Sequence, residues 1–359
     1  MTDFDWARYN LTENPIPGKH PKVDVKDDDI RVNGCLLYDP PVKKTLDDLR
    51  LFVDQDQSPI FLNSSDVLPG TGKSAVMAAE YWRLVGSGAS CFWVEVTGAP
   101  PIKRILLKVA YEMVASKAIE KIKKKLEVRG GIREGIHKVP AVRWYERPLT
   151  RWMIQALSLP EEDFPIALAD VTRKTRAFSV TDAFTFVLEL YRDLVSDRVY
   201  IFLDQLEMYV HYSSARQIAL EMTELQRGIS DRAQLLATMH SDALAKLQLE
   251  CGPDLQTFLE HAPVIQLPKY TPQDMIGVGT YILSKFRKRA EHNQYFPFTA
   301  DSLEYIAKKS GGNIRRFLVR MRSALMLGAV SGYAPLDRKF LSSATAQAHV
   351  FIELPIAEG

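Results

Sequence analysis

The residues with the clearest chemical potential lie at positions 67–74, where the sequence reads Val-Leu-Pro-Gly-Thr-Gly-Lys-Ser. An apolar run at 59–62 precedes them and a helix-favouring stretch at 75–79 follows, so a strand, a tight loop and a helix are expected in this order. Glycine lets the loop backbone curl until its N–H groups point at phosphate oxygens, and the start of the helix adds a partial positive charge. Lys73 has the reach for the β- and γ-phosphates, and Ser74 can ligate Mg²⁺.

This stretch predicts a site for ATP or ADP together with Mg²⁺. The residues expected to contact the nucleotide are Pro69, Gly70, Thr71, Gly72, Lys73, Ser74 and Ala75. One position departs from the usual pattern, because Val67 stands where a glycine six residues before the lysine is typical. A chance glycine turn in front of a helix is the alternative interpretation.

A second acidic motif follows the apolar run 199–203, where Asp204 comes next. A carboxylate at the end of a buried strand is suited to Mg²⁺, so Asp204 joins Ser74 as an expected metal ligand. Capping of the next helix is the alternative role for Asp204. The following residue is Gln205, whose amide can orient a water molecule but is a far poorer base than a carboxylate. Glu207 can take the place of that base, unless it is merely an exposed residue at the start of a helix.

Two further places supply groups for a phosphate or its attacking water. Thr238 and His240 come at the end of the strand expected at 234–238, although a hydrogen-bonded loop residue is the more ordinary role for His240. Arg315 and Arg316 follow a Gly-Gly-Asn turn at the start of a helix, where a guanidinium can meet phosphates; a solvated basic helix is the alternative. We therefore expect catalysis to rest on Asp204, Gln205, Glu207 and Thr238, and nucleotide contact to include Arg315 and Arg316.

These candidates need elements that position them. Short apolar runs alternate with segments whose apolar residues recur at helical spacing, which is typical of an α/β protein with a parallel sheet. Strands are expected at 60–62, 90–96, 199–203, 234–238 and 264–267, and helices at 44–53, 75–85, 102–113, 180–194 and 215–226. The predicted fold class is therefore α/β, a P-loop NTPase parallel-sheet core with a helical insertion and a C-terminal helical lid domain.

Composition shifts divide the chain into four parts. Residues 1–40, rich in Pro, Asp and Asn, are expected to form an irregular arm. Residues 41–268 are expected to form the ATPase core, which a basic insertion interrupts at 101–177. Residues 269–330 are expected to form the helical lid, and 331–359 a C-terminal tail.

The overall composition excludes several protein classes. The 359 residues, 46% hydrophobic and 25% charged, are ordinary for a soluble globular protein. No apolar run approaches the ~20 residues of a membrane-spanning helix, and the N-terminus lacks the features of a signal peptide. Cys35, Cys91 and Cys251 are few and far apart, which argues against a disulfide framework or a zinc site. A cytoplasmic protein with no membrane partner is expected.

The net charge of +2 conceals two basic segments. Residues 103–138 hold eleven Lys or Arg against four Glu, and residues 281–322 hold ten against three acidic residues. Such patches favour an anionic partner. The side chains expected to contact a nucleic-acid backbone, with DNA as the expected partner, are Lys121, Lys123, Lys124, Lys125 and Arg129. A solvated basic face, or a dock for an acidic protein, is the alternative.

Aromatic residues lie among arginines further along the insertion. Trp144, Tyr145 and Trp152 are interleaved with Arg143, Arg147 and Arg151. Aromatic rings beside cations can stack on unpaired bases. Ordinary core aromatics next to solvated arginines are the alternative.

In this order the motifs resemble those of the AAA+ ATPase superfamily. The resemblance rests on Pro-Gly-Thr-Gly-Lys-Ser at 69–74, Ile-Phe-Leu-Asp-Gln at 201–205, Leu-Leu-Ala-Thr at 235–238, Tyr270-Thr271 at the start of the lid, and Gly312-Asn313-Ile314-Arg315 as the second sensor. Within the superfamily the chain is similar to the origin-recognition and initiator-like clade and to related ATPases of mobile-element and anti-phage defence systems. The resemblance covers residues 40–330 and implies ATP and Mg²⁺ as ligands, ATP hydrolysis, and homo-oligomers.

Three departures limit what the resemblance implies. Gln205 stands where the superfamily usually has glutamate, and no arginine lies between Asp242 and Pro268, where its arginine finger is usual; Lys246 is the one cation there. Residues 331–359 are too few for the winged-helix domain with which initiators read DNA. Neither efficient hydrolysis nor initiator-type DNA reading therefore follows.

The expected function is a slow, nucleotide-dependent switch that acts on nucleic acid or on a nucleic-acid-associated partner complex in a DNA transaction or in defence. The alternative is a protein-binding scaffold whose ATP is structural and which makes no direct nucleic-acid contact. A motor ring is a third function, against which the missing arginine finger argues.

Overall fold

The computed structural model describes residues 6–16, 40–64, 71–122, 146–170, 178–250, 259, 261–290 and 293–351. The chain divides into two compact units. Unit 1 comprises residues 1–47, 64–79 and 266–359, and unit 2 comprises residues 48–63 and 80–265. The P-loop lysine and the C-terminal helices thus belong to unit 1, whereas most of the sheet belongs to unit 2.

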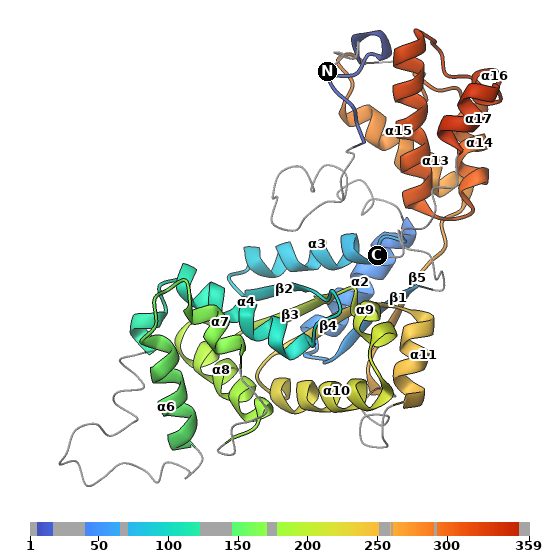
Figure 1. Cartoon of the computed structure of the whole chain (residues 1–359). Helices are drawn as coiled ribbons and strands as arrows, with labels where there is room; N and C mark the ends of the chain where they lie inside the picture. The colour runs from blue at the N-terminus through green and yellow to red at the C-terminus, as the bar shows by residue number, and fades with distance from the viewer. Residues whose placement is uncertain are drawn as a thin grey trace. The chain divides into compact units, whose positions relative to one another are not determined.

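A parallel sheet of five strands in the order β2-β3-β4-β1-β5 organises the α/β part (Figure 1). The strands are β1 (Ile60–Ser64), β2 (Ser90–Glu95), β3 (Val199–Asp204), β4 (Gln234–His240) and β5 (Val264–Leu267). Every residue of β1, β3 and β4 is buried, as is typical of parallel strands covered on both faces. All five expected strands are present, and the predicted α/β fold class is confirmed.

Seven helices accompany the strands in the described part of the core. They are α2 (Pro40–Asp54), α3 (Lys73–Gly86), α4 (Pro101–Ala115), α8 (Val180–Leu194), α9 (Leu206–Tyr212), α10 (Ala215–Ile229) and α11 (Ser241–Glu250). Capping boxes begin α8 at Ser179 and α10 at Ser214, because each serine accepts a backbone N–H of the first turn. Local capping chemistry therefore fixes where these two helices start.

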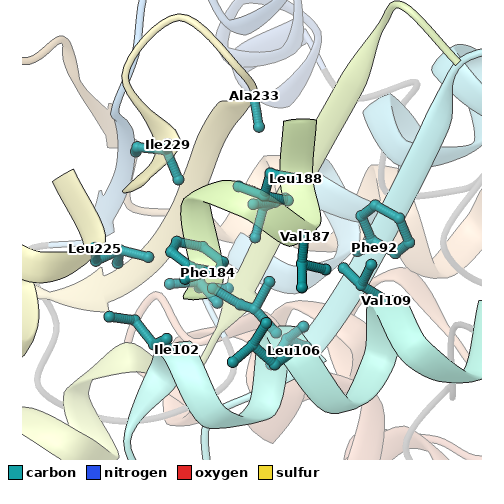
Figure 2. Close-up of a cluster of buried hydrophobic side chains, with 14 of the residues drawn as sticks. Phe92, Ile102, Leu106, Val109, Phe184, Val187, Leu188, Leu225, Ile229 and Ala233 are labelled. Carbon is teal, nitrogen blue, oxygen red and sulfur yellow. The ribbon is translucent and has the colours of Figure 1, made fainter. Parts of the chain in front are cut away.

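The hydrophobic centre of unit 2 lies where α4, α8 and α10 meet (Figure 2). Ile102 of α4, Phe184 of α8 and Leu225 of α10 belong to this cluster, and all three are fully buried. The start of α4 has no side-chain cap of its own, because Pro100 occupies the N-cap. The buried Glu221 of α10 accepts the Ile102 N–H at 2.8 Å instead, so a carboxylate satisfies one of the open N–H groups of that helix end.

The expected insertion at 101–177 begins with α4 and contributes two more helices, α6 (Glu146–Leu157) and α7 (Phe164–Ala169). Helix α7 packs on α4, and Phe164 and Leu168 join the same hydrophobic core. Trp152 of α6 lies against Phe178, with ring centroids 5.6 Å apart, and packs on the core. Trp152 is therefore half-buried against the core, while Trp144 and Tyr145 lie outside the described residues.

Unit 1 ends in a helical part formed by α13 (Pro272–Lys285), α14 (Ala300–Ser310), α15 (Ile314–Ser331), α16 (Arg338–Leu341) and α17 (Ala344–Val350). Helices α13 and α15 approach closely at Gly279, where an added Cβ would lie 3.1 Å from the Phe317 ring. Helix α16 packs on α14, and α17 packs on α15. The expected lid segment is thus helical, and two short helices follow it where the sequence predicted none.

Candidate functional site

The phosphate-binding loop joins the end of β1 to the start of α3, which begins at Lys73. Pro69 and Gly70 lie outside the described residues, whereas Thr71, Gly72 and Lys73 are described. Gly72 has φ of +95°, a conformation that favours glycine. The Lys73 side chain is buried, and its Nζ donates a hydrogen bond to Ser64 Oγ at 3.3 Å.

The start of α3 suits an anionic ligand. The first N–H groups of a helix have no partner within the helix and carry a partial positive charge. Thr71 is buried, and its Oγ1 has no hydrogen-bond partner among the residues that the structure describes. Ser74 is exposed at the first turn of α3, so its hydroxyl can ligate a cation. The next residue, Ala75, is buried. Donors, a buried ammonium and a hydroxyl thus gather in one turn, as a phosphate with its Mg²⁺ requires.

The end of β3 places Asp204 in a tight hydrogen-bond arrangement within unit 2. The Thr238 hydroxyl, from the neighbouring strand β4, donates to Asp204 Oδ1 at 2.6 Å. The Gln205 N–H lies 3.1 Å from the same oxygen and 3.0 Å from Thr238 Oγ1. Thr238 therefore orients the Asp204 carboxylate, whereas the sequence suggested contact with the γ-phosphate or its water.

Gln205 and Glu207 lie in different environments. Gln205 is exposed and has φ 61° and ψ 40°, which is left-handed backbone that few non-glycine residues adopt. Glu207 is buried, and its Oε1 lies 3.3 Å from Nε2 of the buried His240. The structure thus brings a carboxylate and an imidazole together at the ends of β3 and β4, the edge where Asp204 and Thr238 also lie.

Lys246, the one cation in the segment where an arginine finger is usual, has a structural partner. Its Nζ donates to the carbonyl of Val210 at 2.8 Å, near the C-terminal end of α9. A cation is favourable at a helix C-terminus, where carbonyl groups lack helical partners. Lys246 therefore stabilises the packing of α11 against α9 and is engaged within its own chain.

Tyr270, which the sequence marked only as the start of the lid, lies at the P-loop. Its side chain is buried, and its hydroxyl oxygen is 3.7 Å from the position that a Cβ on Gly72 would take. Its backbone carbonyl is 3.4 Å from the corresponding position on Gly312, which has φ of +84°. One residue thus touches both the phosphate-binding loop and the turn before α15, all within unit 1.

The two candidate arginines of the lid lie just after this turn. Asn313 caps α15 by accepting the Arg316 N–H at 3.0 Å. Both guanidinium groups are exposed, and neither pairs with a carboxylate among the described residues. Partial burial nevertheless lowers the pKa of Arg315 from its usual value, but a guanidinium remains charged at neutral pH. Two cations without a carboxylate partner at a helix N-terminus favour an anion there.

Of the five cations expected to contact nucleic acid, the structure describes Lys121 alone. It is exposed in the helical residues 119–122, while Ile119 and Ile122 are buried in the core. In these four residues the apolar side chains face the core and the Lys121 side chain faces outward. Lys123, Lys124, Lys125 and Arg129 lie outside the described residues.

The described residues also bear on two other kinds of site. They contain no group of three or more His, Cys, Asp or Glu arranged to hold a metal ion. Among the same residues, no helix combines the length and the apolar character needed to cross a bilayer.

Comparison with known proteins yields matches among solved structures alone. No family model matches the chain, and no curated protein is significantly similar to it in sequence. Similar solved structures include ORC2 of Aeropyrum pernix in its ADPNP–ADP complexes, with 14% identity and a TM-score of 0.44 over 92% of this chain and 69% of that chain. Cdc6p of Pyrobaculum aerophilum matches with 13% identity and a TM-score of 0.43, over 91% and 67% of the two chains.

Domain III of the Thermotoga maritima replication initiation protein DnaA is a third match, with 10% identity and a TM-score of 0.43 over 85% of this chain and 91% of that chain. At such identities and TM-scores the likeness concerns the fold, and activity must be argued from the residues. These proteins are AAA+ initiator ATPases, the group that the sequence motifs resemble. The chain is an α/β P-loop protein similar in fold to the AAA+ initiator ATPases.

Proposed function

We propose that this chain binds Mg-ATP and hydrolyses it slowly, and that its nucleotide state switches its contact with nucleic acid or a nucleic-acid-associated partner. The observation that carries the proposal is the start of α3, where the Lys73 ammonium is buried beside the buried Thr71 hydroxyl. A buried ammonium is unfavourable unless hydrogen bonds and an anion compensate for lost hydration. The Lys73 ammonium donates one hydrogen bond to Ser64 Oγ, and a triphosphate is an anion whose charge suits this ammonium.

Each expected contact has a role that suits its chemistry. The N–H groups of the P-loop and Lys73 bind the phosphates, and Arg315 and Arg316 add positive charge from the lid. Ser74 and Asp204 would hold Mg²⁺, which when bound neutralises phosphate charge. Thr238 acts on Asp204, because its hydroxyl donates to that carboxylate.

Hydrolysis requires a water oxygen to bond to the γ-phosphorus while the bond to the β,γ-bridging oxygen breaks, which leaves ADP and inorganic phosphate. The Gln205 amide can orient this water but cannot accept its proton at neutral pH. We assign the proton to Glu207, whose carboxylate His240 holds at 3.3 Å, with the phosphate product receiving the proton afterwards. Because no free cation replaces the arginine finger within residues 241–250, the isolated chain is expected to be slow.

A Lys73→Ala variant tests nucleotide binding. Removal of a charged hydrogen-bond donor from the phosphates is expected to weaken ATP binding by ~10–100-fold, which equilibrium titration with a fluorescent ATP analogue measures. Lys246→Ala is the matched control, because its ammonium binds the Val210 carbonyl and should leave ATP affinity unchanged. Thermal unfolding checks that both variants fold. Equal ATP affinity in the Lys73→Ala variant and the wild type would refute the assignment.

Charge reversal tests the nucleic-acid part of the proposal. Lys123, Lys124 and Lys125 are changed together to Glu, and binding to DNA and RNA is measured from low to physiological salt. Backbone contacts predict affinity that falls steeply with salt, little sequence preference, and a large loss in the variant. The control reverses three exposed lysines elsewhere, Lys43, Lys44 and Lys339. If the protein binds ATP but neither triple variant alters its nucleic-acid affinity, the protein-binding scaffold becomes the better-supported function.

A further inference from the structure

The N-terminal segment 6–16 packs on the C-terminal helical part of unit 1, although more than 250 residues separate them in sequence. Leu11 and Arg287 form an antiparallel bridge. Around this bridge the Thr12 N–H donates to the Phe286 carbonyl at 2.8 Å, and the Lys288 N–H donates to the Asn10 carbonyl at 3.0 Å. The segment is thus held by ladder-type backbone bonds rather than by loose surface contact.

The Asn10 side chain extends this pairing. Its Nδ2 donates to the Arg289 carbonyl at 3.0 Å, and its Oδ1 accepts the Arg289 N–H at 3.2 Å. Asn10 has φ of 55°, a left-handed conformation that asparagine tolerates better than most residues. The side chain therefore imitates one more residue of a paired strand.

Tyr9 anchors the segment in the fold. Its side chain and that of Leu11 are both fully buried. The Tyr9 hydroxyl donates to the Tyr333 carbonyl at 2.8 Å, just after the C-terminal end of α15. Burial raises the pKa of Tyr9 to about 12, so the hydroxyl remains a donor throughout the physiological range.

Glycine at two positions makes room for the side chains of the N-terminal segment. A Cβ on Gly328 of α15 would overlap both the Tyr9 hydroxyl and Leu336. A Cβ on Gly332, which ends α15 with φ of +68°, would lie 2.9 Å from Arg8 Nη1. Gly277 of α13 is a contrasting case, since a Cβ there meets nothing within 4 Å. The small residues of α15 thus lie where the N-terminal segment makes contact.

We propose that residues 6–16 act as a strap, an intramolecular ligand that joins the end of α13 to the end of α15 and makes the N-terminus part of the C-terminal helical module. The strap fixes the relative placement of these two helix ends, so its release loosens the module that carries Arg315 and Arg316. The assignment does not depend on nucleotide binding, because every contact that carries it lies between residues 6–16 and 286–336.

Amide hydrogen exchange on the full chain tests the strap. The N–H groups of Thr12 and Lys288 should be protected in the wild type, and Tyr9→Ala should accelerate exchange at both by roughly tenfold or more, since a buried aromatic anchor is lost. Tyr9→Phe, which loses only the hydrogen bond, should have a smaller effect. Tyr111→Ala is the matched control, because Tyr111 is 51% exposed on α4.

A glycine pair supplies an independent arm of the test. Gly328→Ala should accelerate exchange at Thr12 and Lys288, whereas Gly277→Ala should leave it unchanged. Unprotected Thr12 and Lys288 in the wild type, or equal exchange in the Tyr9→Ala and Tyr111→Ala variants, would overturn the strap. Protection that disappears on dilution would also overturn it, because the segment would then dock on a second copy of the chain.

Discussion

At the scale of single residues, two carboxylates have different roles: Asp204 at the end of β3 and Glu207 in the first turn of α9. Asp204 Oδ1 already accepts hydrogen bonds from Thr238 and from the Gln205 backbone, so this carboxylate is fixed in orientation, as a metal ligand needs to be. Those bonds also hold Gln205 in a left-handed conformation that costs a non-glycine residue ~1–2 kcal/mol. Two groups remain as candidates for acting on the attacking water: the exposed Gln205 amide and the buried Glu207 carboxylate.

Substitution at these two positions distinguishes their roles. Glu207→Gln keeps the shape of the side chain but removes the base, so kcat should fall by ~10²–10⁴-fold with ATP affinity unchanged. Gln205→Glu should raise kcat, because it adds a carboxylate beside Asp204. Single-turnover ATP hydrolysis measures both, and the wild-type rate should lie below ~1 per second. A fast wild-type rate, or a normal rate in the Glu207→Gln variant, would contradict the assignment.

His240 offers a finer test of the same group. His240→Gln retains an N–H donor for Glu207, whereas His240→Ala removes it. If His240 positions the carboxylate, kcat should fall in the alanine variant and recover in the glutamine variant, with KM for ATP unchanged in both. Equal loss of kcat in the two variants would show that the imidazole is needed for another reason.

Cys91 gives a residue-scale prediction that concerns stability and reactivity. Burial raises the pKa of its thiol to about 12 from an ordinary value of 9.0. The folded state therefore keeps the thiol protonated where the unfolded state ionises it, so this group costs stability as pH rises above 9 and contributes nothing below it. Alkylation followed by peptide mass mapping should find Cys91 unreactive at pH 8 until urea unfolds the chain. Rapid labelling of Cys91 in the native protein would contradict its burial.

At the scale of elements, the contact between α8 and α10 depends on a glycine. A Cβ on Gly228 would lie 2.7 Å from Phe184 Cε1, and closer still to the neighbouring ring carbon, so α10 can approach α8 here only without a side chain. Phe184 is fully buried and cannot move aside without disturbing the core around it. Close packing, rather than a backbone requirement, thus explains the glycine.

Gly228→Ala is expected to destabilise the fold by ~1–3 kcal/mol, because overpacking forces side chains out of their preferred rotamers. Gly86→Ala is the matched control, since nothing lies within 4 Å of a Cβ at that position of α3. Urea unfolding measured by tryptophan fluorescence should show a lower midpoint for the first variant and little change for the second. Equal midpoints would mean that the core relaxes around the added methyl group.

At the scale of the whole molecule, the proposed function predicts that unit 1 differs in conformation between bound ATP and bound ADP. The P-loop lysine, Tyr270 and the arginines of α15 all belong to this unit. ATP offers a γ-phosphate to Arg315 and Arg316, and ADP does not, so only ATP can favour an arrangement that brings these groups together. The segment 269–272, where Tyr270 touches both Gly72 and Gly312, is where this difference should be visible.

Limited proteolysis should therefore cut near residues 269–272 more slowly with ATP than with ADP, when a slowly hydrolysed ATP analogue is used. The Lys73→Ala variant serves as control and should show one cleavage pattern under both conditions. An Arg315→Ala, Arg316→Ala double variant should lose the difference while it still binds nucleotide. Identical patterns with the two nucleotides in the wild type would contradict a nucleotide-dependent lid.

The sequence by itself determined the five strands, the α/β class, the P-loop and the position of Asp204. These features are encoded locally, because short apolar runs, glycine spacing and a polar residue after a buried strand involve neighbours in the chain. It did not predict α16 and α17, which are only four and seven residues long and stand on α14 and α15. Helices this short gain their stability from packing rather than from propensity.

Only the tertiary structure decided which partner each candidate group has. Lys246 read as the one substitute for an arginine finger, yet its ammonium binds the Val210 carbonyl. The sequence left open whether Glu207 is exposed, and the structure buries it beside His240. Tyr9 belonged to an expected irregular arm, yet it is buried against the end of α15. In each case the partner lies on another element, and the physical reason is the same: a local pattern fixes what a side chain can bind, whereas the packing of distant elements fixes what it meets.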